Sequence, residues 1–460
     1  MENSNLLQLI RSFSPGEQKS AFRFLKSPYF NRRRDIIQLY QVLCKNAVLQ
    51  KTSIWEHVYP GEPYHDTRFR LLMSYLNRLL ETFLLLEADR EHDITTKLQL
   101  ATIYRNRGLM GHYERNMRAV KHKISAQPLR NAWYHRQLRD YHAERHETTM
   151  RLNPTGVETL RTLGQHTDVE YLSHRLRLIC LEMAQKNVYR SAEENPVHEV
   201  VIRLAEREEW KQVPSIATYL AACKMLAFPE DNTRYQTLKV QLLTQQDIFS
   251  TEEMRELYRF SINHCIRQTN RGERSLEQEV LFLYQNALQH GYLFENGTLS
   301  RFTYHNIVAA ALRCHELEWA AHFILHYNGY IDASYRDSSL SFNQARLDYA
   351  RKRYDSVLLL LQKANYKDPL LHLAAKTLLL KTYFSLQEFD LLQSHLDAMR
   401  NYIHRKKVIG YHRTNYLNII RFTERLLSRE PGNRLAQEEL RTDIEQEQVL
   451  TEKEWLLEQV

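Results

Sequence analysis

Two histidines one helical turn apart, His142 and His146, come nearest in this chain to a metal site. A zinc-protease helix carries a glutamate directly after the first histidine, where it reaches the metal-bound water. Here Glu144 comes one position later, about 100° further round a helix. A histidine pair in this spacing still chelates metals, but no acidic or cysteine third ligand is evident. The sequence therefore predicts a polar helix surface and no metal site.

Motifs for other chemistry are absent from the sequence. It contains no G-x-G-x-x-G or G-x-x-x-x-G-K-[ST] phosphate loop and no G-x-S-x-G nucleophile elbow. The adjacent pairs His264-Cys265 and Cys314-His315 would point to different sides of a helix. We therefore expect no enzymatic activity and no cofactor, and an enzyme with an unrecognised site stays as a third alternative.

Positive charge is concentrated between residues 97 and 151. This segment holds 12 Lys and Arg against 4 Asp and Glu, so it carries the whole net charge of +8. Such a surface would neutralise nucleic-acid phosphates, and Tyr104 and Trp133 would stack bases. The alternatives are a solvated face, or a dock for an acidic segment such as the tail from Glu430 onward. Helical spacing places four arginines on the outward faces of two neighbouring helices: Arg115, Arg118, Arg136 and Arg139.

Length and composition indicate long helices with short connections. The chain has 460 residues, 43% of them hydrophobic, with 12 Gly and 11 Pro, about half or less of average usage. Its five scattered cysteines predict reduced thiols in a cytoplasmic protein. The amino terminus lacks the basic start and apolar core of a signal peptide. No apolar run reaches 18 residues, so we expect an all-α protein that does not associate with membranes.

The chain is expected to fold in three parts. Residues 1–91 read as an N-terminal helical domain, in which Ser14-Pro15-Gly16-Glu17 forms a helix start with a capping box. Residues 92–429 read as a helical-repeat region, in which helices are joined by short loops and no stretch alternates long enough for a strand. Residues 430–460 read as an acidic helical tail that serves as a cap or packing arm. The clearest amphipathic stripe lies in the first part: Leu72, Tyr75, Leu76, Leu79, Leu80 and Phe83.

A 35-residue repeat organises the region from about Tyr304 to Met399. Its aromatic position recurs as Trp319, Tyr354 and Phe389. A period of this length, with each unit split into two helical halves, indicates stacked helix hairpins. We expect three antiparallel helix pairs over residues 300–400, with the aromatic residues at equivalent positions and Phe389 buried. Nine residues before each aromatic residue lies a small or apolar residue: Ala310, Ala345 and Leu380. After Phe389, apolar residues follow at helical spacing: Leu392, Leu396 and Met399.

The repeat resembles the tetratricopeptide-repeat pattern. The best unit, Leu340–Pro369, carries Ala345, Tyr354, Val357, Leu361 and Ala364 in the family's order. A degenerate early copy runs from Leu100 through Tyr113 to Pro128, and the unit around Trp319 departs from the pattern. The resemblance covers about a hundred residues. The whole chain also resembles bacterial helical proteins, a similarity that implies no activity.

In tetratricopeptide arrays, the first helix of each pair lines a concave surface that binds peptides. The resemblance therefore implies a protein–protein interaction scaffold or adaptor. The runner-up is nucleic-acid binding through residues 97–151, which would lose affinity steeply with salt. The alternative for the groove is that neighbouring helices or the acidic tail fill it. The groove positions carried over from the family are Tyr304, His315, Arg346, Tyr349, Lys381 and Phe384.

Overall fold

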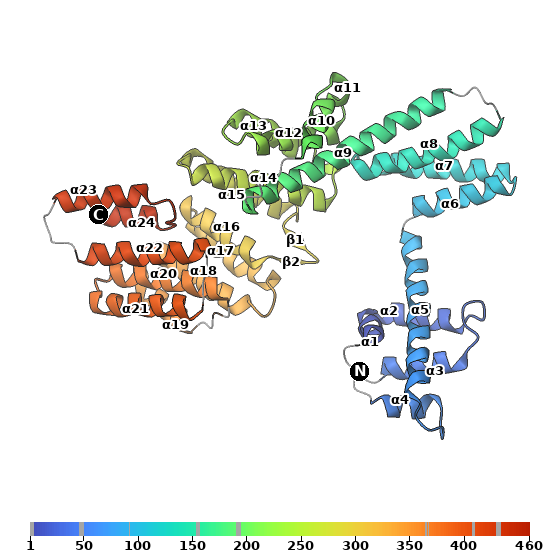
Figure 1. The fold of residues 1–460 in the computed structure, drawn as a ribbon, viewed down its shortest axis with the longest axis horizontal. Helices are drawn as coiled ribbons and strands as arrows, with labels where there is room; N and C mark the ends of the chain where they lie inside the picture. The colour runs from blue at the N-terminus through green and yellow to red at the C-terminus, as the bar shows by residue number, and fades with distance from the viewer. Residues whose placement is uncertain are drawn as a thin grey trace. The chain divides into compact units, whose positions relative to one another are not determined.

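The computed structural model is almost entirely helical, which confirms the predicted all-α class (Figure 1). Contacts divide the chain into two compact units, Met1–Arg175 and Leu176–Val460. This division does not coincide with the predicted boundaries after residues 91 and 429. Ala364 and residues 92, 429 and 430 lie outside the described part of the chain. The structure describes residues 4–45, 50–91, 93–152, 157–189, 195–363, 366, 368–406, 410–428 and 434–460.

The first unit starts with five helices around one apolar core. Ser14 accepts a hydrogen bond from the Glu17 amide, and the Glu17 carboxylate accepts one from the Ser14 amide, which confirms the predicted capping box. Leu72, Leu76 and Leu80 of the predicted stripe are fully buried in this core. The helices of the unit are α1 Asn5–Ser12, α2 Pro15–Lys26, α3 Arg34–Lys45, α4 Lys51–Val58, α5 Asp66–Glu91, α6 Asp93–Asn106, α7 Met110–Ala126, α8 Ala132–Leu152 and the start of α9 Val157–Tyr189.

The second unit continues as a succession of helices from the end of α9 to the carboxyl terminus. No described helix is long and apolar enough to cross a membrane. Its α-helices are α10 Pro196–Ala205, α11 Glu208–Lys211, α12 Pro214–Ala227, α13 Asn232–Thr244, α14 Thr251–Thr269, α15 Glu277–Gln289, α16 Arg301–Arg313, α17 Leu317–Tyr327, α18 Arg336–Ala350, α19 Tyr354–Lys363, α20 Pro369–Ser385, α21 Phe389–Arg405, α22 Gly410–Leu427, α23 Arg434–Gln446 and α24 Lys453–Gln459. Short 3-10 helices lie at Gln246–Ile248, Arg274–Leu276 and Asn328–Tyr330.

One small hairpin corrects the expectation of no strands. Strands β1 Phe294–Glu295 and β2 Thr298–Leu299 pair antiparallel between α15 and α16. The turn residues Asn296 and Gly297 both have positive φ, 50° and 75°. Asn-Gly is the preferred sequence for a two-residue hairpin turn of this kind. The Asn-Gly dipeptide therefore indicated a hairpin turn. The strands of two residues that flank it are too short to show an alternating pattern.

Three helix pairs over residues 301–405 follow the predicted organisation: α16 with α17, α18 with α19, and α20 with α21. Each pair is closed by the same turn, in which one residue adopts φ 59°: His315, Lys352 or Gln387. The next amide donates to a carbonyl five residues back, for example Arg353 to Asp348 at 2.8 Å. This is a Schellman turn, which ends a helix with a left-handed residue.

The turns show that the first pair is out of the predicted register. Lys352 and Gln387 are 35 residues apart, but His315 and Lys352 are 37 apart. Tyr354 and Phe389 are the first residues of α19 and α21, so these two aromatic residues are equivalent, as predicted. Their equivalent in α17 is Leu317, and Trp319 is two residues further on. The longer first repeat includes the 3-10 turn Asn328–Tyr330 between α17 and α18, and the equal aromatic spacing was a coincidence.

The prediction that Phe389 is a buried anchor is also wrong. Phe389 is 48% exposed and touches Phe384 edge-on at a ring distance of 6.1 Å. A first residue of a helix lies beside the turn, where few neighbours can cover it. The predicted stripe that follows it is correct: Leu392, Leu396 and Met399 are completely buried.

The carboxyl-terminal tail packs onto the preceding helices, as expected of a packing arm. Leu440 and Ile444 of α23 join the core that contains Leu380 and Leu396. Leu456 of α24 is completely buried in the same core. The acidic residues of α23 and α24 are exposed, whereas Glu452, between the two helices, pairs with Lys381 of α20.

Replacing Lys352 with glycine is expected to raise the free energy of unfolding by about 0.5–1 kcal/mol. A left-handed conformation costs a residue with a Cβ about 1–2 kcal/mol, and the greater freedom of glycine in the unfolded chain offsets part of that gain. Urea unfolding of the wild type and the variant measures the difference. Lys352→Ala keeps the Cβ and is the control. Equal stabilities of the Gly and Ala variants would contradict a strained turn.

Candidate functional site

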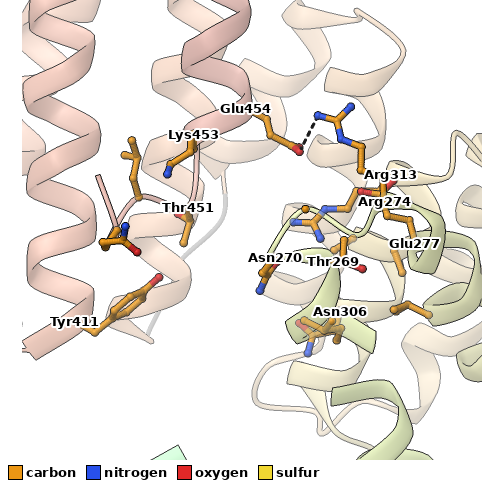
Figure 2. A pocket seen from close by; sticks show the side chains of 17 residues that line it. Thr269, Asn270, Arg274, Glu277, Asn306, Arg313, Tyr411, Thr451, Lys453 and Glu454 are labelled. Carbon is orange, nitrogen blue, oxygen red and sulfur yellow. Dashed lines mark hydrogen bonds and ion pairs between the residues drawn. The ribbon is translucent and has the colours of Figure 1, made fainter. Parts of the chain in front are cut away.

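A cavity of the second unit lies where α14, the 3-10 helix Arg274–Leu276 (η2), α15 and α16 face α22 and the segment 448–454. We call it the inner cleft. It has a volume of about 600 Å³. Asn306, Ala309 and Arg313 of α16 line one wall, and Tyr411 of α22 lies opposite. Figure 2 shows Asn306 and Arg313 on one side of the opening and Tyr411 on the other. The cleft is therefore lined by the α14–α15 pair, by the first helix of the α16–α17 pair, by α22 and by the tail.

The lining of the inner cleft combines charge with an exposed aromatic ring. Arg274 pairs with Glu454 across the opening, with 3.4 Å between guanidinium and carboxylate (Figure 2). Both partners are mostly exposed, so this single pair contributes little to holding the walls together. Arg313 is exposed and makes no ion pair with the described residues. Tyr411 is 54% exposed. The cleft thus offers cations and an aromatic surface but no nucleophile with an adjacent base.

Four predicted groove residues lie together on α18 and α20. Arg346 and Lys381 are equivalent in the 35-residue register, as are Tyr349 and Phe384. Arg346 donates to the His305 carbonyl at 3.0 Å, and its removal from water lowers the pKa of its guanidinium to about 10. Burial likewise raises the pKa of Tyr349. The structure therefore brings these four side chains onto one face.

The prediction is wrong for the other two groove residues, Tyr304 and His315. Tyr304 is completely buried, and its hydroxyl donates to the Ile324 carbonyl at 2.7 Å, so it packs inside its own helix pair. His315 is exposed, but it is the left-handed residue of the turn and lies outside the helix. Neither residue is at a position equivalent to Arg346 or Tyr349. In the 37-residue register, the α16 equivalents of Arg346 and Tyr349 are Ala309 and Leu312.

The four predicted polyanion-binding arginines do not form one uncompensated surface. Arg115 and Arg118 of α7 are exposed, as predicted. Arg136 and Arg139 of α8 both pair with Glu170 of α9, Arg136 at 3.2 Å. Arg139 also pairs with Asp140 at 2.8 Å. The charge count within residues 97–151 left out Glu170, which the fold brings in from another helix.

The histidine motif does not assemble a metal site in the described chain. Glu144 accepts hydrogen bonds from Arg105 at 2.6 Å and from Thr102 at 2.8 Å, so its carboxylate oxygens already have partners other than a metal-bound water. The His142 ring stacks on His166, and His146 Nδ1 lies 2.9 Å from the Thr159 hydroxyl. No group of three potential metal ligands occurs among the described residues.

The five cysteines are all free thiols. Cys180 of α9 and Cys223 of α12 are fully buried, with 3.2 Å between their sulfur atoms. Burial raises the pKa of Cys180 well above its ordinary value. Because the thiolate is the nucleophile in cysteine chemistry, this pair is poorly suited to catalysis.

A cluster of three histidines predicts that the first unit loses stability in mild acid. His135 and His166 lie 3.4 Å apart between Nδ1 atoms, and His142 stacks on His166. Burial lowers the pKa of all three, that of His135 to about 4. The charges of Arg130, beside His135, and of Lys121 and Arg145, beside His142, act in the same direction.

Between about pH 6.5 and 4, the unfolded chain binds a proton at His135 that the folded chain does not. Stability contributed by neutral His135 is therefore present above pH 6.5 and falls as the pH decreases, by about 2 kcal/mol at pH 5. Melting curves from pH 7.5 to 5 should show a shallower loss for His135→Gln than for the wild type. The exposed His57 provides the control His57→Gln, which should keep the wild-type slope. Identical slopes for all three proteins would contradict the prediction.

Sequence reasoning missed the residues that give the inner cleft its charge, Arg274 and Arg313. No local sequence signal singles out Arg313, because its place in the cleft depends on residues of α22 and of the tail that lie about a hundred or more positions away. Arg274 follows Gly272, but its position opposite Glu454 depends on contacts between segments 180 residues apart. Compared with known proteins, the chain matches no family model, no curated protein and no solved structure.

Proposed function

We propose that this protein is a non-enzymatic, cytoplasmic scaffold that binds a segment of a partner protein on the inner face of tetratricopeptide-like stacked helix pairs. The observation that carries the proposal is the inner cleft of about 600 Å³ beside the first helix of the α16–α17 pair. Repetition of the same turn at His315, Lys352 and Gln387 supports a stacked array. A repeated array presents equivalent side chains at regular intervals, which suits an extended or helical peptide.

The charges of the cleft favour an acidic partner. Arg274, Arg313 and Lys453 line it against Glu277 and Glu454, and one carboxylate is already paired. The exposed ring of Tyr411 adds an amphipathic contact surface. Peptide recognition commonly combines such aromatic contacts with cationic groups for acidic residues. We therefore expect aspartate and glutamate side chains of the partner to lie near Arg313.

Short fluorescent peptides test this function when each is made in an acidic form and in a form with Asn and Gln instead. Wild-type protein should bind the acidic forms more tightly, as measured by fluorescence anisotropy. Arg313→Glu should weaken that binding at least about tenfold, which corresponds to about 1.4 kcal/mol. Arg259→Glu is the matched control, because Arg259 is exposed on α14 and does not line the cleft. Equal binding of both forms, or no binding, would refute the proposal.

Nucleic-acid binding through α7 is the second candidate, and the exposure of Arg115, Arg118 and the Trp133 ring favours it. Pairing of Arg136 and Arg139 with Glu170 weakens it. Oligonucleotide binding at low salt should fall in the double variant Arg115→Glu, Arg118→Glu. The slope of log affinity against log salt should shrink by up to about 0.9 per lost duplex-phosphate contact. Equal weak binding by both proteins would exclude this function.

A further inference from the structure

The inner face of α18 and α20 already holds an occupant, the carboxyl-terminal segment of the same chain. Glu452, which precedes α24, pairs with Lys381 at 2.8 Å. Trp455 lies edge-on against Phe384 at a ring distance of 5.5 Å. The Lys381 ammonium also lies 5.4 Å from the Tyr349 ring and 5.6 Å from the Trp455 ring. An acidic residue and an aromatic residue three positions later thus engage the face.

The contacts of this segment show what chemistry the face accepts. Lys381 and Glu452 are mostly buried, with 18% and 28% of their side chains exposed, so their attraction is screened less than that of a surface pair. Trp455 is 7% exposed, and its indole ring adds contact area along Phe384. Buried aromatic residues and charge pairs at the centre of an interface commonly carry most of its binding energy.

The occupied face and the inner cleft are continuous. Lys453 and Glu454 of α24, and Leu450 and Thr451 before it, line the cleft, while Glu452 between them reaches Lys381. Figure 2 shows Thr451, Lys453 and Glu454 along one side of the opening. A longer peptide that followed the path of this segment would therefore also reach the cations of α16 and η2.

We propose that the inner face docks a partner segment that carries an acidic residue followed three residues later by an aromatic residue, and that residues 450–460 are the resident occupant that this partner displaces. This inference rests on the proposed scaffold function and names the partner's chemistry. Partner and tail compete because both need Lys381 and Phe384. The pair Glu452 and Trp455 is the template for the partner's two anchor residues.

Because the tail is covalently attached, a partner needs a higher affinity for the face than the tail segment alone would have. A short connection gives an attached segment an effective concentration on the order of 1 mM. A separate peptide that makes only the same contacts therefore cannot displace the tail of the wild-type chain at micromolar concentration. The partner must make additional contacts, and acidic residues placed near Arg274 and Arg313 in the cleft supply them. Its motif is accordingly longer and more acidic than α24.

A charge exchange in the full-length chain tests the proposal. Glu452→Lys places a cation against Lys381, and Lys381→Glu places a carboxylate against Glu452, so each weakens the tail's contact. The probe is a fluorescent peptide of residues 447–460, made with the native Glu or with Lys at position 452. The Glu peptide should bind the Glu452→Lys chain at least tenfold more tightly than the wild type. The Lys peptide should prefer the Lys381→Glu chain.

Two controls separate displacement from other effects. Glu454→Lys makes the same change of charge two residues further along the chain. It removes only the exposed pair with Arg274, so it should not open the face to the peptide. Glu452→Gln, which removes the pair without repulsion, replaces Glu452→Lys if circular dichroism shows that the latter is unfolded. A peptide of scrambled sequence should bind none of the chains.

The proposal is overturned if folded variants with a weakened tail bind the peptides no better than the wild type, or if both peptides bind both variants equally. The tail would then be a structural cap only. The proposed scaffold function is tested separately. It is refuted if the acidic peptides of unrelated sequence bind no better than their Asn and Gln forms, or do not bind at all. Binding of those peptides without binding of the tail peptide leaves the scaffold function intact and removes this inference.

Discussion

Replacing Leu396 with alanine is expected to lower the free energy of unfolding by about 2–5 kcal/mol, whereas Phe389→Ala should cost less than about 1 kcal/mol. Leu396 is completely buried on α21, and its core also contains Leu380, Leu440 and Leu456. Truncation removes apolar contacts and leaves a cavity that its neighbours fill only in part. Phe389 is 48% exposed, so its truncation empties little volume.

Urea unfolding followed by circular dichroism measures both variants, with Leu396→Met as a volume-conserving control that should lose less than about 1.5 kcal/mol. Because the core joins α20, α21, α23 and α24, the Leu396→Ala protein should also become sensitive to proteolysis near its carboxyl terminus. A larger loss from Phe389→Ala than from Leu396→Ala would show that α21 faces the other way and that the described register is wrong.

Removing the Arg177 side chain should lower the free energy of unfolding by about 3 kcal/mol. Its guanidinium donates to both carboxylate oxygens of Glu256, at 2.7 and 2.8 Å, and to Glu252 at 2.9 Å. The hydrogen bonds with Glu256 raise the pKa of Arg177, so it stays charged. Glu256 is only 9% exposed, so Arg177→Ala leaves a buried carboxylate without its main partner. Breaking such a pair costs more than the intact pair contributes.

The double variant Arg177→Met, Glu256→Met distinguishes the two effects, because it removes both charges and keeps similar volumes. It should recover most of the stability that Arg177→Ala loses. Arg203→Ala is the matched control, since the pair of Arg203 with Glu199 is exposed and such pairs contribute about 0–1 kcal/mol. Equal small losses in Arg177→Ala and Arg203→Ala would show that Glu256 is solvated in the folded protein.

Much of the local structure followed from the sequence. The capping box at Ser14, the stripe through Leu72 and Leu80, and the three helix pairs all depend on interactions between residues a few positions apart. Helical periodicity and caps are short-range properties, so one sequence is enough to read them. The buried stripe from Leu392 to Met399 was correct for the same reason.

Long-range packing determines which helix faces another and which charged side chains remain unpaired. Tyr304 is buried because it packs against α17, where its hydroxyl donates to the Ile324 carbonyl, and His315 lies in the turn between the two helices. Glu170 neutralised arginines that a local count left unpaired. Glu452 reached Lys381 across 71 positions and filled part of the expected groove. Long-range packing selects these partners from many equally charged residues, and the helical period of each segment carries no information about that selection.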